Sequence, residues 1–120
     1  MSDPNGDRTV VNAYTTPFLP YDLEGPAQPE MSWRPVSYDR ETGLGSYFMR
    51  MEPGAVTIEH HHEVMEKFLI LEGDLVDSDG SVFGSGDFVS YEAGTRHNSW
   101  TENGCLILVC EWQRPASVRP

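Results

Sequence analysis

Three of the four histidines in this chain are consecutive, within the stretch IEHHHEVMEKFLILEG at residues 58–73. Successive side chains of a β-strand point to opposite faces, so His60 and His62 would share one face and His61 would take the other. The Cα atoms of His60 and His62 would be about 6.6 Å apart on such a strand, close enough for two imidazoles to bind one ion. Strand parity therefore allows two of the three histidines, His60 and His62, to approach one ion together.

A carboxylate and a distant histidine could complete such a site. The chain must turn after His62, because β-type sequence starts again at Glu66. On that returning strand Glu66, Phe68 and Ile70 share one face, and an inward Glu66 brings its carboxylate toward the histidines. The fourth histidine is His97. A buried carboxylate among neutral imidazoles is costly unless a cation neutralises it, which favours a divalent metal. The alternatives are a surface cluster of histidines, or core histidines that bond to one another.

The composition of the chain limits its size class and its partners. Its 120 residues fit a single domain, and a hydrophobic fraction of 38% supports a globular fold. Nineteen acidic residues against eight Lys and Arg leave a formal net charge of −11. Such a surface repels phosphate backbones and anionic membranes, so we expect neither nucleic-acid binding nor membrane binding.

The two cysteines and the first residues indicate the compartment. Cys105 and Cys110 flank one apolar strand, where their Cα atoms would be about 16 Å apart and their side chains on opposite faces. A disulfide needs Cα atoms within about 7 Å, so we expect free thiols and a reducing cytoplasm. The first ten residues carry no signal-peptide pattern, and no apolar run is long enough for a membrane span. The sequence predicts a cytoplasmic protein.

Short β-type segments with turn residues between them make up most of the chain. Residues 1–30 hold five prolines and are predicted to form an arm, partly ordered against the body or against a second subunit. Residues 31–120 are predicted to form the body. Its strand-like segments are 43–52, 55–61, 66–73, 74–84, 86–94, 96–104 and 105–113, and its turn signals are Glu72-Gly73, Asp79-Gly80, Ala93-Gly94 and Asn103-Gly104. Without helical periodicity, this spacing indicates an all-β sandwich or barrel.

The same residues resemble the motifs of a known superfamily, the cupins. The leading cupin motif is G-x5-H-x-H-x3-E-x6-G, and its fixed positions are occupied here by Gly54, His60, His62, Glu66 and Gly73. The second cupin motif is G-x5-P-x-G-x2-H-x3-N. Here Gly86, Gly94 and His97 match it, while Glu92 replaces the proline and Thr101 replaces the asparagine. Neither departure touches a proposed ligand.

This resemblance implies a fold, a metal and a branch of the superfamily. The implied fold is a single-domain, RmlC-like cupin β-barrel, also described as a double-stranded β-helix or jelly roll. The resemblance implies that His60, His62, Glu66 and His97 bind one divalent metal ion. Fe(II) is favoured, and Zn(II), Ni(II), Mn(II) or Cu(II) also suit nitrogen and oxygen ligands. Residues 71–105 look like the ChrR-type branch, which includes the sensor half of a zinc-dependent anti-sigma factor and stand-alone dioxygenase-like proteins. We find no counterpart of the helical sigma-binding half, so we do not expect an anti-sigma role.

Strand parity and side-chain size select the residues expected to line a substrate pocket. These residues are Phe68 and Ile70 beside Glu66, Tyr47 and Met49 on a neighbouring strand, and Phe83, Phe88 and Trp112 as further candidates. Core packing is the alternative role for each of them. Arg96 and Trp100 should face away from His97, toward solvent and toward sheet or dimer packing respectively.

The implied ligand set leads to a hypothesis about function. Three histidines and one carboxylate would leave one or two open positions on a six-coordinate ion, which suits a small substrate that chelates through two oxygens. The leading hypothesis is a non-haem iron dioxygenase that acts on a small dicarbonyl or phenolic ketone. The alternatives are a metal-dependent isomerase or lyase on the same scaffold and a non-catalytic metal or metabolite sensor. We also expect a homodimer, because the arm could add an edge strand to a neighbour.

Overall fold

A computed structural model describes residues 6–58, 60–61 and 63–113 of the chain, without the side chains of His60 and His61. The residues described form β-strands joined by turns and bends, and none of them is helical. Within this part of the chain, accordingly, no helix has the length and apolar character that a membrane crossing needs. The prediction of an all-β fold is confirmed.

The described residues form ten strands, and β5 is the central one. In chain order the strands are β1 Leu19–Pro20, β2 Met31–Asp39, β3 Leu44–Met51, β4 His60–His61, β5 Met65–Asp77, β6 Val82–Gly84, β7 Phe88–Tyr91, β8 Arg96–His97, β9 Ser99–Trp100 and β10 Cys105–Trp112. Their hydrogen-bonded order is β1-β2-β3-β10-β5-β6, with β7 and β9 also paired to β5. β4 and β8 pair with each other.

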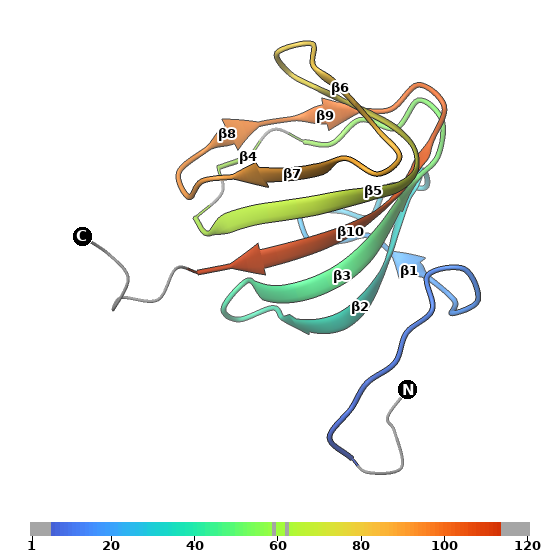
Figure 1. Cartoon of the computed structure of the whole chain (residues 1–120), viewed down its shortest axis with the longest axis vertical. Helices are drawn as coiled ribbons and strands as arrows, with labels where there is room; N and C mark the ends of the chain where they lie inside the picture. The colour runs from blue at the N-terminus through green and yellow to red at the C-terminus, as the bar shows by residue number, and fades with distance from the viewer. Residues whose placement is uncertain (1–5, 59, 62, 114–120) are drawn as a thin grey trace.

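The long strand β5 belongs to both layers of the barrel. Its first half pairs with β10 on one side and with β7 on the other. Its last residues pair with β6 and β9 instead. Figure 1 shows β2, β3, β10 and β5 side by side in one curved layer, with β8 and β9 in the other layer. The two layers enclose the core, as expected of a jelly roll.

An irregularity in the middle of β5 replaces the turn that we expected at Glu72-Gly73. The strand continues through this dipeptide, and its register against β10 shifts so that Leu71 is left without an opposite residue. Such an extra residue is a β-bulge, and it reverses the inward and outward faces beyond it. The buried residues before the bulge include Phe68 and Ile70, and those after it include Leu75 and Asp77. Residues an odd number of positions apart on β5 therefore reach the same interior.

Gly73 can form this bulge because it has no side chain, which both its conformation and its close surroundings would exclude. Its φ is 84°, in the left-handed region that favours glycine. A Cβ atom there would lie 1.9 Å from the backbone oxygen of Gly104 and 2.8 Å from Cα of Cys105. The last glycine of the first motif is thus explained by the packing of β5 against the start of β10.

The core includes residues that precede the predicted body. Tyr21 is 7% exposed, and its ring packs edge-on against Trp33 with centroids 6.1 Å apart. β1 pairs with β2 along the same edge. The buried cluster consists of Tyr21, Met31, Trp33, Tyr47, Met49, Met51, Ala55, Phe68, Ile70, Leu75, Cys105, Ile107 and Val109. The segment around Tyr21 is therefore part of the barrel wall.

Two local predictions are confirmed. The Asp79-Gly80 dipeptide forms the hairpin turn between β5 and β6, where the N–H of Asp77 donates to the carbonyl of Ser81 at 2.8 Å. The two cysteines are free thiols, with Cys105 buried and Cys110 half-buried.

Candidate metal-binding site

Short strands that flank β5 bring a histidine and its polar partners to the inside of the barrel. β8 carries His97, and β5 carries Glu66 before the bulge and Asp77 after it. β4 pairs with β8 so that His60 is the residue opposite His97. β7 pairs with β5 so that Tyr91 is opposite Glu66. Residues that are distant in the sequence thereby meet at one place.

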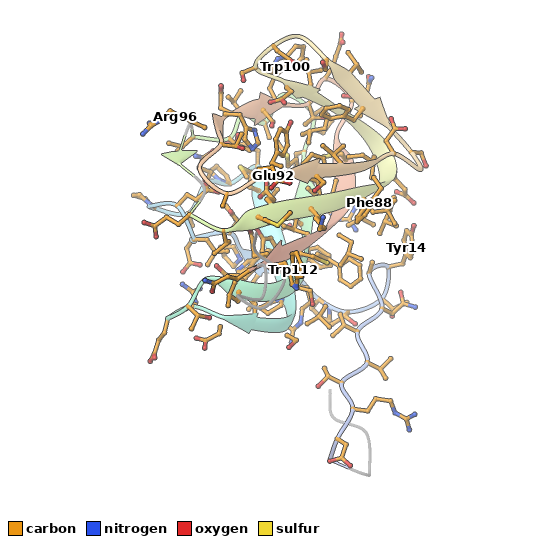
Figure 2. The ribbon with its side chains drawn as sticks, turned by 60° about the vertical axis from the view of Figure 1, so that its left-hand side comes forward. Tyr14, Phe88, Glu92, Arg96, Trp100 and Trp112 are labelled. Carbon is orange, nitrogen blue, oxygen red and sulfur yellow. The ribbon has the colours of Figure 1, made fainter. Side chains whose placement is uncertain are left out.

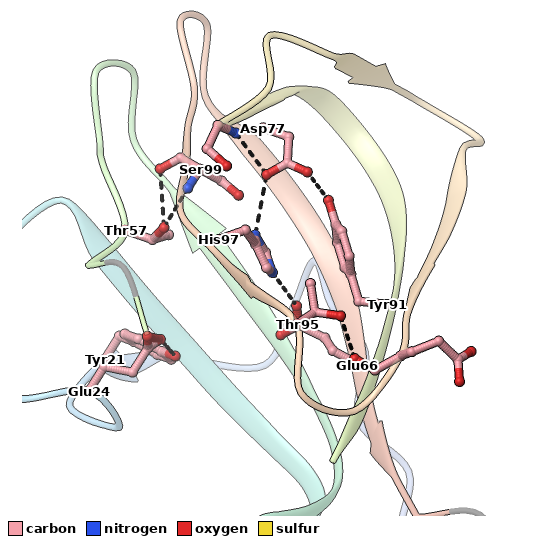
Figure 3. Close-up of polar contacts among 11 residues, drawn as sticks. Tyr21, Glu24, Thr57, Glu66, Asp77, Tyr91, Thr95, His97 and Ser99 are labelled. Carbon is pink, nitrogen blue, oxygen red and sulfur yellow. Dashed lines mark hydrogen bonds and ion pairs between the residues drawn. The ribbon is translucent and has the colours of Figure 1, made fainter. Parts of the chain in front are cut away.

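His97 lies between two carboxylates (Figure 3). Its Nε2 is 3.4 Å from Glu66 Oε1, and its Nδ1 is 3.3 Å from Asp77 Oδ1. His97 and Asp77 are each 7% exposed. The two ring nitrogens of His97 therefore have different partners, and both partners come from β5.

Two more glutamates lie close to Glu66. Glu111 on β10 is directly opposite Glu66 on β5. Burial, together with the charge of Glu66 and a hydrogen bond to it, raises the pKa of Glu111 to about 9. The Glu111 carboxyl is therefore protonated at neutral pH. Glu24 approaches from the N-terminal segment, and its Oε1 accepts a 2.5 Å hydrogen bond from the Tyr21 hydroxyl.

The barrel encloses a cavity of about 40 Å³, which Glu66 and His97 help to line. Apolar side chains of β3, β5 and β10 form most of its wall. A wider hollow of about 320 Å³ adjoins it, and Tyr21, Glu24, Tyr47 and Glu66 line both spaces. Among the described residues that line either space, none is a lysine or an arginine. The polar side chains that a ligand would meet are thus carboxyls, phenols, the imidazole and the hydroxyls of Thr42, Thr57 and Ser99.

The sequence matches one family profile over almost its whole length. The profile is that of the ChrR cupin-like domain, and it matches residues 8–115. The chain belongs to this family. A comparison with curated proteins found no match.

Solved structures share the fold of this family member at low sequence identity. A chain of the crystal structure of Rhodobacter sphaeroides SigE in complex with the anti-sigma ChrR aligns with 71% of this chain at 19% identity, with a TM-score of 0.60. Only 45% of that SigE–ChrR chain is covered, so this chain spans less than half of its length.

Two further structures align over most of this chain. The polyketide cyclase RemF from Streptomyces resistomycificus is 23% identical over 88% of this chain and 80% of its own, with a TM-score of 0.65. An RmlC-like cupin from Ralstonia eutropha JMP134 is 16% identical over 88% of this chain and 69% of its own, with a TM-score of 0.71. These similarities establish the cupin jelly-roll fold, as the sequence motifs predicted.

The structure brings two of the four predicted metal ligands together, Glu66 and His97. His60 stands opposite His97 through its backbone pairing, but its side chain lies outside the description. His62 lies outside the described residues altogether. Among the side chains that the structure does describe, no three His, Cys, Asp or Glu residues are arranged to hold an ion. The four-residue ligand set therefore stays a prediction.

The predicted pocket residues are divided between the cavity, the core and the outer surface. Tyr47, Met49 and Phe68 line the cavity. Ile70 is buried in the core cluster, and Phe83 packs against that cluster, with its ring centroid 6.1 Å from that of Phe68. The last two residues therefore contribute to packing and not to the cavity wall.

Phe88 and Trp112 lie on the outer surface, which corrects the prediction that they face the pocket (Figure 2). Phe88 is 64% exposed, because alternate residues of β7, including Tyr91, take the inward positions. Trp112 is 41% exposed, because Glu111 before it takes the inward position on β10. Lys67 lies over the Trp112 ring instead, with Nζ 5.9 Å from the centroid.

The residues expected opposite His97 are on the outside of the barrel. Arg96 is exposed, and Trp100 is 40% exposed, as strand alternation predicted. Thr101, which replaces the motif asparagine, is fully buried, and its hydroxyl donates to the Asp74 carbonyl at 2.7 Å. It also accepts a hydrogen bond from the Gly104 N–H at 2.9 Å, so its role is to hold a turn.

Sequence reasoning missed three acidic residues at this site. Strict alternation along β5 places Asp77 outside, and only the bulge turns it inward. Glu111 shares the parity of the buried Val109 and could have been found from that alternation. Glu24 follows a proline-rich segment, where the sequence has no period that would indicate which way a side chain faces.

Proposed function

We propose that this protein binds one divalent metal ion where β4, β5 and β8 meet, and uses it to transform a small molecule in the cavity. The leading form of the proposal is a non-haem iron dioxygenase that acts on a small dicarbonyl or phenolic ketone. The observation that supports it most directly is the 3.4 Å approach of His97 Nε2 and Glu66 Oε1 at the cavity wall.

The two described ligands fit a metal ion. Donor atoms bound to one ion at about 2.1 Å and at right angles are about 3 Å apart, which is close to the observed separation. The other nitrogen of His97 faces a carboxylate, which is the usual surrounding of a metal-bound histidine. We propose His60, opposite His97 on β4, as a third ligand and His62 as the fourth. This set of nitrogen and oxygen donors suits Fe(II) as well as Zn(II), Ni(II), Mn(II) or Cu(II).

The size of the cavity favours a compact substrate. Its volume of about 40 Å³ is far below that of pockets that enclose drug-sized ligands, roughly 300–1,000 Å³. The reacting end of a substrate would fit inside, and the remainder would occupy the hollow of about 320 Å³ beside it. Bound iron(II) would supply redox chemistry with O2, whereas a redox-inert metal would supply Lewis acidity.

The side chains around the cavity can orient such a substrate through hydrogen bonds. Burial raises the pKa of Tyr47 well above its ordinary value, and the charges of nearby acidic and phenolic groups add to this effect. The Tyr47 phenol therefore remains a donor at neutral pH. Glu111 also lines the hollow, where its raised pKa makes it a donor to Glu66. The Tyr47 phenol suits a substrate with carbonyl or enol oxygens.

Two alternative functions would use the same proposed metal site for something other than dioxygenase chemistry. A metal-dependent isomerase or lyase is supported by the structural similarity to the polyketide cyclase RemF. A non-catalytic sensor of a metal or metabolite is supported by membership of the ChrR cupin-like domain family. The identity of the metal and the consumption of O2 distinguish these alternatives from a dioxygenase.

The first experiment measures bound metal in untagged protein by elemental analysis. We expect one divalent ion per chain, lost in His60→Ala and in His97→Ala because each removes a ligand. His61→Ala is the matched control and should keep its metal, because His61 is predicted to face away. Metal content that both ligand substitutions leave unchanged would contradict the site.

The second experiment tests the reaction by following O2 uptake with a panel of β-diketones and added Fe(II). Uptake that depends on both the diketone and iron supports the dioxygenase. Firmly bound zinc without O2 consumption would reject the dioxygenase and leave the metal site standing.

A further inference from the structure

Two residues beside His97 belong to no predicted ligand set, and the first of them is Asp77. A buried carboxylate is costly unless hydrogen bonds satisfy it. The backbone N–H of Ser78 donates to Asp77 Oδ1 at 2.8 Å, and the hydroxyl of Tyr91 donates to Asp77 Oδ2. The carboxylate is thus held from two directions while Oδ1 faces Nδ1 of His97.

The second residue, Tyr91, contacts both His97 and Asp77 (Figure 3). Its ring stacks on the imidazole of His97, with centroids 4.2 Å apart and planes 20° apart. Stacking restricts the tilt of the imidazole, and the contact with Asp77 at its edge restricts rotation of the ring. Tyr91 therefore links the two restraints through its hydroxyl.

We infer that Asp77 and Tyr91 are positioning residues that hold His97 in one tautomer and one orientation, with the proton on Nδ1 and the lone pair on Nε2. A neutral imidazole carries one N–H donor and one acceptor nitrogen, and an ionised carboxylate only accepts. Asp77 faces Nδ1 and Glu66 faces Nε2, so each carboxylate favours the N–H on its own side, and a cation bound beside Glu66 leaves the N–H on the nitrogen that faces Asp77. The lone pair of Nε2 then points to Glu66 and to the cavity. Histidines that bind metals generally donate their other N–H in this way.

The bulge in β5 is what allows one strand to act on both ring nitrogens. Glu66 lies before the bulge and Asp77 after it, and the reversal of faces turns both inward. A regular strand would place only one of them inside. The choice of this tautomer rests on the proposed function, because the bound ion would take the Nε2 side, whereas the contacts of Asp77 and Tyr91 with His97 do not rest on it.

Metal affinity is the first readout of the inference. We would compare Asp77→Asn and Tyr91→Phe with the unchanged protein, using Zn(II) or Co(II) in competition with a chromophoric chelator. Loss of such an outer carboxylate typically weakens metal affinity about 10–100-fold, which we expect for Asp77→Asn. Tyr91→Phe keeps the stacked ring and should weaken affinity by a smaller factor. Asp87→Asn is the matched control, because Asp87 caps Gly84 in the turn between β6 and β7.

The tautomer of His97 is the second readout, measured by 15N NMR of the metal-free protein at a pH where imidazoles are neutral. His97→Gln assigns the signal. We expect a smaller share of the Nδ1–H form in Asp77→Asn than in the unchanged protein and in Asp87→Asn. Melting temperatures show whether each variant folds. If Asp77→Asn does not fold, Tyr91→Phe serves as the test.

The outcomes separate this inference from the proposed function. If the His97 tautomer and the metal affinity are both unchanged in folded Asp77→Asn and Tyr91→Phe, the inference is overturned, whichever metal the protein binds. A protein that binds no divalent metal, but has a smaller share of the Nδ1–H form in Asp77→Asn, overturns the proposed function and upholds the positioning role.

Discussion

The carboxyl groups around the cavity take different hydrogen-bonding roles because their neighbours differ. Asp77 accepts hydrogen bonds from Ser78 and Tyr91, and its Oδ1 lies 3.3 Å from His97 Nδ1. Glu111 is buried beside Glu66, which raises its pKa and makes it a donor at neutral pH. Carboxyl groups thus serve both as acceptors and as donors within a single barrel.

The two thiols should differ in reactivity for reasons of the same kind. Burial raises the pKa of Cys105 to about 12, with a further contribution from the charge of Asp74, and the residue is only 5% exposed. At pH 8 a thiol with that pKa has roughly one molecule in 10⁴ as the reactive thiolate. We expect iodoacetamide at pH 8 to modify the half-buried Cys110 first, and Cys105 only when the protein unfolds.

Mass spectrometry of peptides over a time course measures both thiols in one sample. Cys110→Ser is the control, because it leaves Cys105 as the only thiol. Rapid modification of Cys105 in this folded variant would contradict the burial that the structure assigns to it.

At the scale of elements, the bulge decides which residues the sequence could predict. Regular alternation correctly placed Glu66 and Phe68 on one inner face, because both precede the bulge. It could not place Asp77, because nothing in the sequence fixes where an extra residue reverses the faces. The glycine at the bulge is also a turn signal, so the sequence predicts that a strand ends there. A glycine with positive φ occurs both in turns and in bulges, and only the pairing with the neighbouring strand shows which of the two is present.

The bulge glycine gives a prediction about stability. Gly73→Ala should destabilise the protein by more than about 3 kcal/mol, because a Cβ atom would lie 1.9 Å from the Gly104 oxygen and the backbone would have to move. Gly54→Ala is the matched control. Gly54 has a φ of 88° and nothing within 4 Å of an added Cβ, so only the conformational cost of about 1 kcal/mol applies. Urea unfolding measures both, and equal effects would contradict the close approach.

The turn that follows β9 gives a second prediction. Thr101→Val keeps the shape of a fully buried side chain but leaves the Gly104 N–H without its acceptor. We expect a loss of about 1–3 kcal/mol in the free energy of unfolding. Thr42→Val, at an exposed turn, should cost less than about 0.5 kcal/mol. A Thr101→Val variant as stable as the unchanged protein would show that the hydroxyl is dispensable.

At the scale of the whole molecule, the sequence predicted the barrel but not which residues of the N-terminal segment pack against it. Repeated turn residues at the spacing of short strands indicated an all-β fold, and the resemblance of the two histidine motifs to those of the cupins implied the jelly roll. The proline-rich segment gave no such period, so the burial of Tyr21 and the position of Glu24 at the cavity had no sequence signal. Side chains from this segment become wall residues only through contacts with β2 and β3, which the sequence does not specify.

Truncation of the N-terminal segment should therefore affect stability in two steps. Removing residues 1–10 should change little, because the described part of that stretch is exposed. Removing residues 1–25 also removes Tyr21 from its contacts with Trp33 and Tyr47. Loss of one such buried aromatic side chain costs about 3–5 kcal/mol, so we expect a much lower melting temperature. Melting curves of the two truncated proteins test this, and equal effects would contradict the packing.

The same pair of truncated proteins tests the homodimer, which stays a prediction. Sedimentation should report dimers for the unchanged protein and for the shorter truncation. If the arm adds a strand to a neighbour, the longer truncation should be monomeric. A monomeric unchanged protein would contradict the predicted assembly.

The position of Tyr21 and Glu24 has a consequence for how ligand preference can diverge among relatives. These two residues line both the cavity and the adjoining hollow, yet they come from a segment that carries none of the predicted metal ligands. Exchanging residues 22–26 between homologues, with β1 and Tyr21 kept, would give the barrel a new entrance. Selection can therefore change the entrance without changing the strands that carry the predicted metal ligands, and such a chimaera tests which small molecules the entrance admits.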